Sequence, residues 1–595
     1  MSKSYTRLRV KRRLRKRKDQ VVDLSQSANR QIERHIFRRW HNLRGAGRFA
    51  FVWVGLIAIL IIATLIQIKS LGRYYLIPQP VSGGVYTEGI IGTFSNANPI
   101  YATSNVDTAV SKLMFGSLFT YDSKNQLVSD LAKSYEVDDR GVIYTVHLRP
   151  NLLWHDGEAL TSDDVVFTYA TIQNPDAKSP LQYNWTGVKV EKVDKLTIRF
   201  ILPSAYSPFP HSLTSGIIPK HLLKDVPVSQ LRSAAFNTKS PIGSGPFALK
   251  EIEVSQVSDA TQSNTIQFTR FDKYHRGTPK LDGITIKTYS DEDALYKAFR
   301  ANQVISAAGL NMADQDIETK YETVSLNMTS ANMLFLKTTN ATLSDVKVRQ
   351  ALIKAVDVPS LTEKVSYPTI PVREPILNGQ IGYDSTLQQF IFNRQEAVTL
   401  LDAAGWKINA KERFRTKDGK SLILHLAYES NPDFSRIASV LQKQWADVGI
   451  NLVVDVNQDS STANYLDSHD YDILLYGINI GADPDVYAYW HSSQADIKNL
   501  THLNLSEYKS SKADLSLEVA RARSDTALRA VKYKPFLEAW RNDVPAIGLY
   551  QPRYLYITNQ HLYGLKDTTQ INSPSDRFNN VHNWMINTTQ KTRSS

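Results

Sequence analysis

The sequence predicts an α/β protein of at least two lobes behind an N-terminal transmembrane helix. Three observations predict this architecture. The chain has 595 residues, which is too long for one hydrophobic core. A run of uncharged, mostly apolar residues lies near the N-terminus, at 49–68. Beyond it, short apolar strand-like segments alternate with helical periodicities, a pattern typical of α/β folds.

The run 49–68 has the length of a transmembrane helix, because about 20 apolar residues cross a hydrocarbon layer roughly 30 Å thick. Arg48 and Lys69 bracket it. A cleavable signal peptide has a shorter apolar region and a small-residue cleavage motif, so a retained single-pass anchor in the cell membrane is predicted. Basic residues near a span stay on the cytoplasmic side, and here they are concentrated before it. The N-terminus is therefore expected inside and the large domain outside the cytoplasm.

The positive charge of the chain is concentrated in a basic cytoplasmic tail, 1–48, with 16 Lys/Arg and three acidic residues. The remainder holds 54 basic and 55 acidic residues, so it offers no general attraction to nucleic acid, and no nucleic-acid partner is expected. The run Lys11–Lys18 could bind nucleic acid, but its position near the predicted span favours membrane lipid. The segment 32–43 has the periodicity of an amphipathic helix, which would lie on the membrane or bind an intracellular partner.

Local signals predict a linker, several helices and several strands after the span. The linker, at 69–81, contains Gly72, Pro78 and Pro80, and such residues are typical of loops. Thr161 and Asp164 form a capping box at a helix start. Three further helices are expected: Val348–Ala355 with Ser344 as N-cap, Ala397–Ala404 ended by Gly405, and Ile437–Val448 ended by Gly449. Strands are expected at 422–426, 450–456 and 471–478.

Catalytic chemistry has no positive sign in the sequence. Cysteine is absent, which excludes disulfides and thiolate chemistry. The nucleophile elbow, the zinc-protease motif and the phosphate-binding loop are also missing. His155–Asp156 and His469–Asp470 are adjacent pairs without a further ligand, and such pairs are usually loop or capping residues. The chain is therefore predicted not to be an enzyme, and no cofactor or metal is expected.

A series of short segments carries a resemblance to a known family. In order along the chain they are Leu131–Tyr135, Tyr144–Arg149, Leu153–Gly157, Leu160–Val165, Pro241–Phe247, Val348–Asp357, Leu400–Trp406 and Asn504–Tyr508. This ordered series resembles the bacterial extracellular solute-binding proteins of family 5, the oligopeptide-, dipeptide- and nickel-binding group. The matching segments extend over nearly all of 85–560.

The resemblance implies a periplasmic-binding-protein-like fold, in which two hinged α/β lobes enclose a ligand cleft. Lobe I is then expected at 82–325 and 549–595, with an inserted subdomain at 127–238, and lobe II at 326–548. The implied function is to capture oligopeptides and deliver them to an ABC importer. Because the chain has no ATP-binding motif, the permease would work with separate ATPase subunits.

Other functions of the same fold stay open, because a fold does not determine its ligand. The solute could be a nickel chelate, an oligosaccharide or an opine instead of a peptide. The chain could also be an anchored sensor or adhesion module without transport. An extracellular hydrolase is disfavoured by the missing nucleophile and metal motifs.

The ligand site is expected around Tyr471–Trp490. In peptide-binding relatives, a carboxylate in this region pairs with the α-amino group of the peptide, but here residues 479–481 are Asn, Ile and Gly. Asp483 and Asp485 are the nearest substitutes. Asp483 precedes Pro484, so it is equally consistent with a residue that only begins a turn.

Four further residues are candidates for contact with the ligand. Tyr476, Asn479 and Trp490 belong to the same segment and are predicted to line the site. Arg373 is a candidate partner for a ligand carboxylate, because guanidinium groups bind carboxylates in bidentate geometry.

Overall fold

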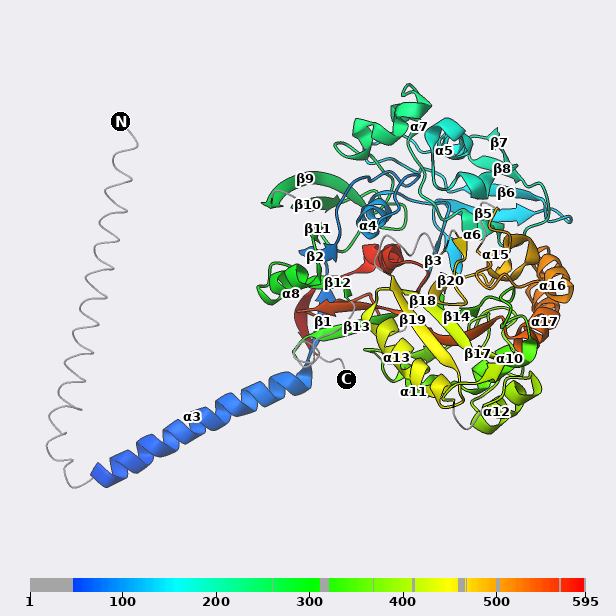
Figure 1. Ribbon diagram of the computed structural model, residues 1–595. Helices are drawn as coiled ribbons and strands as arrows, with labels where there is room; N and C mark the ends of the chain where they lie inside the picture. The colour runs from blue at the N-terminus through cyan, green and yellow to red at the C-terminus, as the bar shows by residue number, and fades with distance from the viewer. Residues whose placement is uncertain are drawn as a thin grey trace, which may run out of the picture. The chain divides into compact units, whose positions relative to one another are not determined.

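The computed structural model describes residues 47–592, with gaps at 259–260, 311–319, 368, 409–411, 458–465, 467, 499–502 and 567–568 (Figure 1). The predictions for the basic tail, including Lys11–Lys18 and the segment 32–43, lie outside the described residues. The chain divides into two compact units, one of Met1–Gln79 with Thr588–Ser595 and one of Pro80–Asn587. Each unit is described by itself below.

Helix α3 (Gly47–Tyr75) dominates the first unit and includes the predicted span 49–68. Its described apolar side chains are largely exposed, from 51% at Leu56 to 84% at Phe51. Within the part of the chain that the structure describes, no helix is long and apolar enough to cross a membrane. The membrane span therefore stays a prediction.

The segment predicted as a linker, 69–81, has regular structure. Helix α3 continues to Tyr75, and β1 (Leu76–Val81) follows at once and pairs with β24 (Asn587–Thr592) in a two-stranded sheet. Pro78 and Pro80 favoured a loop in the sequence, but an edge strand tolerates proline because its outward N–H groups need no ladder partner.

An eight-stranded mixed sheet organises the first part of the second unit. Its strands, in spatial order, are β23 (Gln570–Ile571), β13 (Glu322–Met328), β22 (Arg553–Thr558), β12 (Ser306–Leu310), β2 (Val85–Ile91), β11 (Gly283–Tyr289), β10 (Thr261–Arg270) and β9 (Phe247–Ser258). Helices α4 (Asn105–Met114), α8 (Glu292–Arg300) and η8 (Pro574–Asn583) contact it or its connections. The sheet thus unites strands from both ends of the chain.

A four-stranded antiparallel sheet lies within the segment predicted as an inserted subdomain, 127–238. Its order is β5 (Ala132–Val137), β6 (Ile143–Leu148), β8 (Thr197–Ile201) and β7 (Lys189–Asp194), and α5 (Ser162–Gln173) contacts β7 and β8. The segment also contains the helices α6 (Phe209–Ser212) and α7 (Lys220–Leu223) and the short turns η3 (Pro175–Ala177), η4 (Gln182–Trp185), η5 (Val228–Ser233) and η6 (Ala235–Asn237). Its strand β4 (Leu127–Ser129) forms a hairpin with β3 (Phe119–Tyr121), which precedes the segment. One hydrophobic core cluster extends through this segment and the eight-stranded sheet.

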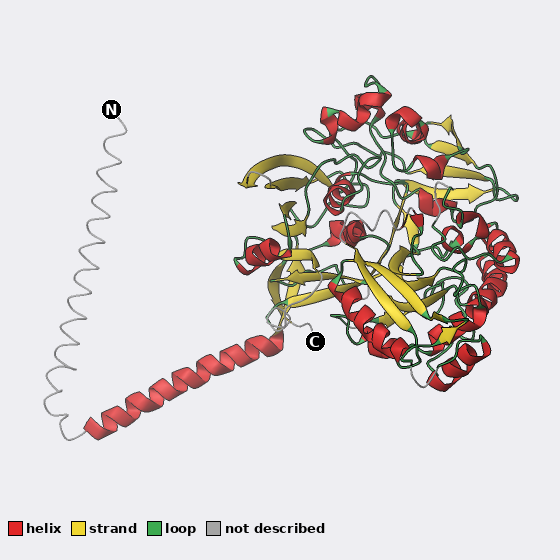
Figure 2. Cartoon of the chain, in the orientation of Figure 1, coloured by secondary structure: helices red, strands yellow, loops and turns green. Residues whose placement is uncertain are grey.

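A six-stranded sheet organises the middle of the chain. Its order is β15 (Ile370–Pro371), β21 (Ala546–Gln551), β14 (Ser330–Leu336), β20 (Ile473–Asn479), β18 (Ile423–Glu429) and β19 (Asn451–Asn457). Every residue of β14 is buried, and separate core clusters cover the two faces of the sheet. Figure 2 shows the surrounding helices: α10 (Val346–Lys354), α11 (Val358–Thr362), α12 (Arg394–Ala403), α13 (Pro432–Ala446), α15 (Tyr487–Trp490), α16 (Ser511–Arg521) and α17 (Thr526–Asp543). The turn η7 (Ser492–Gln494) and the hairpin β16 (Thr416–Lys417) and β17 (Lys420–Ser421) complete it.

The chain passes between the two large sheets twice, each time through one residue. Thr329 joins β13 to β14, and Pro552 joins β21 to β22. The predicted boundaries, after 325 and 548, lie a few residues earlier. The difference arises because β13 and β21 keep their ladder hydrogen bonds up to the crossing, and no break in the apolar pattern marks the end of either ladder.

The helix predictions from local signals are confirmed. The capping box of Thr161 and Asp164 begins α5, and Gly405 and Gly449 follow α12 and α13 with φ of +88° and +86°. The N-cap of α10 is Asp345, whose carboxylate accepts from Lys347 N, one residue later than the predicted Ser344.

Candidate ligand-binding site

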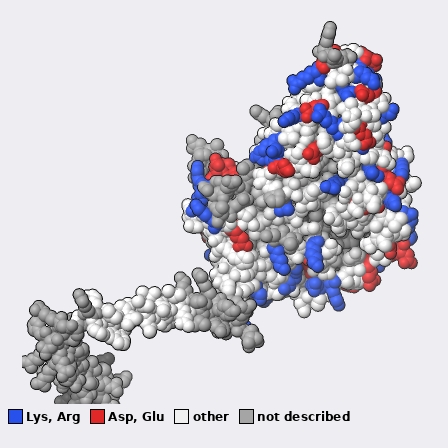
Figure 3. Space-filling model, turned by 90° about the horizontal axis from the view of Figure 1, so that it is seen from below, with Lys and Arg blue, Asp and Glu red and all other residues white. Residues whose placement is uncertain are grey.

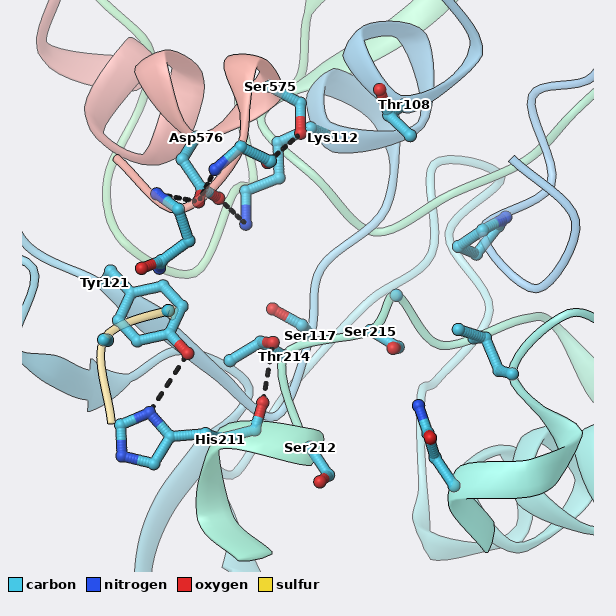
Figure 4. A pocket seen from close by; sticks show the side chains of 18 of the residues that line it. Thr108, Lys112, Ser117, Tyr121, His211, Ser212, Thr214, Ser215, Ser575 and Asp576 are labelled. Atoms are coloured by element: carbon cyan, nitrogen blue, oxygen red, sulfur yellow. Dashed lines mark hydrogen bonds and ion pairs between the residues drawn. The ribbon is translucent and has the colours of Figure 1, made fainter. Parts of the chain in front are cut away.

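A cavity of about 500 Å³ is lined by residues of the helices and loops that connect the strands of the two large sheets, and by Tyr121 of the hairpin β3–β4. One side, which we call the first wall, consists of Pro99, Ala102, residues of α4, of 115–121, of 181–185, of 206–216 and of 572–576. The other side, the second wall, consists of residues 480–485 except Pro484, directly after β20. Figure 4 shows hydroxyl groups of Thr108, Ser117, Ser212, Thr214, Ser215 and Ser575 in the first wall. The lining is therefore mainly polar.

Helix α4 carries Thr108, Ser111 and Lys112 into the first wall. The hydroxyl of Ser104 caps its start by accepting from Asp107 N at 3.0 Å. The other end of α4 packs closely against the glycine-rich loop Pro241–Phe247. The packing is so close that a Cβ at Gly243 would stand 1.9 Å from the carbonyl oxygen of Met114. Glycine is therefore required there for close backbone approach.

His155 holds that glycine-rich loop. Its backbone N–H donates to Gly243 O at 2.8 Å, Gly243 N donates back to its Nδ1 at 3.3 Å, and its Nε2 lies 3.0 Å from Gly245 O. Burial lowers the pKa of His155 to about 4, so the ring is neutral at physiological pH. The segments Leu153–Gly157 and Pro241–Phe247 thus fix the end of α4 structurally.

Lys112 and Asp576 lie side by side in the first wall (Figure 4), with Lys112 Nζ 3.9 Å from Asp576 Oδ1. Asp576 Oδ2 accepts from the backbone N–H groups of Asn572 and Ser573, at 3.0 and 3.1 Å, and so caps η8. The side chain of Lys112 is 18% exposed. The cation stands in the last turn of α4, where the helix dipole favours positive charge.

Tyr121 and His211 form a stacked pair in the same wall. The Tyr121 hydroxyl lies 3.1 Å from His211 Nδ1, and His211 Nε2 is 3.8 Å from Asp483 Oδ2 in the second wall. Burial lowers the pKa of His211, although Asp483 opposes the shift, and burial raises the pKa of Tyr121. Both rings are therefore uncharged hydrogen-bonding groups at neutral pH.

Ion pairs hold the second wall. Both terminal nitrogens of the Arg529 guanidinium donate to the carboxylate of Asp483, which is a bidentate pair. Burial opposes the charge on Arg529, but Asp483 and Tyr533 together outweigh burial and raise the pKa of that guanidinium. Arg521 donates to Asp485 Oδ2 at 2.8 Å and lies between the rings of Tyr206 and Tyr487. Both acidic side chains of this wall are thus already paired with arginine.

The structure brings two of the predicted site residues, Asp483 and Asp485, to the cavity. Asn479 stands just before the second wall, where its Nδ2 donates to Asn572 O at 3.2 Å. Trp490 is fully buried and stacks on Phe335 in the core, because its large apolar surface is covered by the helices of the six-stranded sheet.

The other two predicted site residues lie apart from the cavity lining. Tyr476 packs against the same core cluster as Trp490, on β20. Arg373 lines a separate hollow of about 530 Å³, formed mainly by residues 358–371, and its guanidinium is 3.5 Å from Gln388 Oε1. Their contact with the ligand remains a prediction.

Sequence reasoning missed the first wall. Lys112 sits in an unremarkable amphipathic helix, so no local pattern distinguishes it. The cluster of His211, Ser212, Thr214 and Ser215 was a usable signal, since polar side chains gather there beside Gly216.

The comparisons with known proteins agree on one family. Residues 126–499 match the bacterial extracellular solute-binding proteins, family 5 Middle. The oligopeptide-binding protein AppA of Bacillus subtilis (strain 168) is 29% identical over 527 residues, which cover 85% of this chain and 92% of that protein.

Solved structures show the same similarity. AppA from Bacillus subtilis in complex with a nonapeptide has a TM-score of 0.66 at 27% identity, covering 86% of this chain and 100% of that one. NikZ from Campylobacter jejuni in complex with Ni(L-His) has a TM-score of 0.69 at 26% identity, covering 84% and 99%. The family match covers more than half of the sequence, and this chain belongs to the bacterial extracellular solute-binding proteins, family 5.

Proposed function

We propose that this protein is a membrane-anchored receptor that captures short oligopeptides in the cavity and delivers them to an ABC importer. The observation that carries the proposal is the polar cavity between the first and second walls, in a chain similar over 85% of its length to an oligopeptide-binding protein. Its volume of about 500 Å³ lies within the ~300–1,000 Å³ typical of small-molecule sites. This favours short peptides over long ones.

The chemistry of the lining suits a peptide whose sequence varies. Ser and Thr hydroxyls donate and accept hydrogen bonds, so they can pair with main-chain N–H and C=O groups in any register. Water can adapt the remaining contacts to different side chains. Such a site binds and releases its ligand without chemistry, and we propose no catalytic role for any residue of the walls.

The proposed anchor is the run 49–68, on the evidence of the sequence, with the N-terminus in the cytoplasm. Support comes from the uncharged run 49–68, from the exposed apolar side chains of α3, and from the basic residues that precede it. Figure 3 shows Lys/Arg and Asp/Glu interspersed over the visible face of the second unit. The sequence of the N-terminal tail is strongly basic, so lipid attraction is expected at the N-terminus. Protease added to intact cells should remove the mass after residue 75 and spare the tail; full protection would contradict this topology.

The ligand class can be tested on the full chain purified in mild detergent from its native cells. After denaturation, the released small molecules are identified by mass spectrometry. Peptides of a few residues are expected. A homogeneous sugar, opine or nickel–histidine complex would replace the peptide proposal with another solute. Cleavage of added peptides without a stable complex would refute the receptor function.

A further inference from the structure

The charged side chains of the cavity differ in how many of their hydrogen bonds and ion pairs the protein itself supplies. Asp483 and Asp485 in the second wall each have an arginine partner within hydrogen-bonding distance. Asp576 in the first wall accepts two backbone hydrogen bonds. Among the described residues, Lys112 Nζ has only the contact of 3.9 Å to Asp576 and no hydrogen bond.

An ammonium group carries three N–H donors and is strongly solvated in water. The Lys112 side chain is 18% exposed, so most of that solvation is lost in the cavity. A buried charge is stable only when it is paired and hydrogen-bonded. Asp576 serves this need incompletely, because its nearer oxygen lies beyond hydrogen-bonding distance and its other oxygen caps η8.

Hydroxyl donors with spare capacity line the same cavity. Within the described part of the chain, the side chains of Ser111, Ser212 and Ser215 form no hydrogen bond with protein groups. Figure 4 shows Ser212 and Ser215 without a dashed line. A carboxylate has two oxygens that accept several hydrogen bonds, so it can use one ammonium and several hydroxyls together. A neutral amide can use the hydroxyls but gains no charge pairing.

The geometry points to Lys112 as the group that binds the carboxylate of the ligand, with hydroxyls of the first wall as additional donors. This inference rests on the proposed function and deepens it: the ligand is a peptide with an unblocked α-carboxylate or an acidic side chain near Lys112. Asp483 is not assigned a comparable role toward a ligand amine, since the bidentate pair with Arg529 already compensates its negative charge.

The test measures binding to the full chain in detergent by isothermal titration calorimetry. The probes are a synthetic mixture of tri- to pentapeptides without acidic side chains, with C-terminal carboxylates, and the same mixture with C-terminal amides. The variants are Lys112→Gln, Lys112→Arg and, as a matched control, Lys133→Gln, which removes an exposed lysine of β5.

Lys112→Gln should weaken binding of the carboxylate mixture by ~30-fold or more and that of the amide mixture by less than about 3-fold. Lys112→Arg should restore most of the preference for the carboxylate, and Lys133→Gln should change neither affinity. Equal losses for both mixtures, or no loss for either, would overturn the inference and leave Lys112 as a structural partner of Asp576.

A second panel separates this inference from the peptide proposal. If the wild-type protein binds neither peptide mixture, its heat unfolding is followed with amino acids, hydroxy acids and sugar acids. Stabilisation by these carboxylates that Lys112→Gln abolishes would support the carboxylate site and refute the peptide ligand. Stabilisation by none of them, or one that Lys112→Gln leaves intact, would refute the carboxylate site.

Discussion

The two walls of the cavity are built on different physical plans. In the second wall, the carboxylates of Asp483 and Asp485 are both paired with arginines, and these ion pairs hold the loop 480–485 in place. In the first wall, Lys112 and the hydroxyls of Ser111, Ser212 and Ser215 form no hydrogen bond with the described residues, whereas other hydroxyls, such as those of Ser117 and Thr214, donate to backbone carbonyls. Groups that the protein already satisfies position a wall, whereas unsatisfied groups are left for a ligand. Under the proposed function, the second wall supports the loop after β20 and the first wall recognises the ligand.

The largest expected effect comes from breaking the ion pair of the second wall. Arg529→Met leaves Asp483 buried without its partner and should lower the free energy of unfolding by ~3–5 kcal/mol. Fluorescence-monitored urea unfolding measures it. The exposed Arg523→Met is the control and should change little. Adding Asp483→Asn to Arg529→Met should recover part of the loss; an additive further loss would show that the pair is not what stabilises the wall.

Glu374 provides a contrast to the paired carboxylates of the second wall, because it is a buried carboxyl group that has no arginine partner among the described residues. Its Oε2 accepts from Asp384 N at 3.1 Å, and its Oε1 has no partner among the described residues. Burial raises its pKa to about 8, above the 4.5 of an exposed glutamate. Folding therefore takes up a proton between these values, and wild-type stability should fall as pH rises from about 4.5 to 8.

Glu374→Gln removes this titration. The stability of the wild type relative to the variant should fall by roughly 1.4 kcal/mol per pH unit within the window, which is at most about 5 kcal/mol over the whole window from 4.5 to about 8. Chemical unfolding at several pH values measures the difference. The exposed Glu158→Gln should show no such slope. Parallel curves for the wild type and Glu374→Gln would show that Glu374 is ionised in the fold.

Gly243→Ala tests whether the loop that packs against the end of α4 is needed to position the first wall. The added Cβ would meet the carbonyl of Met114, two residues from Lys112, so the end of α4 must move. A loss of about 1–3 kcal/mol in stability is expected, with weaker ligand binding. Gly55→Ala, which places its Cβ in open space within α3, is the control. Unchanged binding in a destabilised variant would separate the support of α4 from recognition.

The smallest effect is expected at the start of α5, which lies away from both walls. Thr161→Ala removes a capping box and should cost about 1 kcal/mol of stability with unchanged ligand affinity. Thr186→Ala serves as the control, because the exposed side chain of Thr186 makes no capping hydrogen bond and only its backbone N–H caps η4. A change in ligand affinity would show that this helix start is coupled to the cavity.

Local signals in the sequence predicted local structure well. The glycines after α12 and α13 and the capping box of α5 act within a few residues, so a single stretch of sequence contains the whole cause. The strand predictions at 422–426, 450–456 and 471–478 correspond to β18, β19 and β20, with shifts of one to three residues at their ends.

The candidate site was predicted only in part, because its residues meet through the fold. Asp483 could be found from its Asp-Pro step, but its partner Arg529 lies 46 residues later on α17. Trp490 was predicted as a lining group. Its large apolar surface suits a hydrophobic core equally well, and in the structure the side chain is buried in the core. Lys112 and Asp576 lie at opposite ends of the sequence.

Thr329 links the second wall to the crossing between the sheets. Its carbonyl accepts from the backbone N–H groups of Ile480 and Gly481, at 2.9 and 3.1 Å, while its own N–H donates to Ile571 O on the other side. Two single-residue crossings, at Thr329 and Pro552, define an axis much as two pins define a door hinge. Rotation about that axis would move the second wall together with Thr329, to which it is hydrogen-bonded. A small change in the backbone torsions of Thr329 would therefore shift the residues of the second wall that line the cavity.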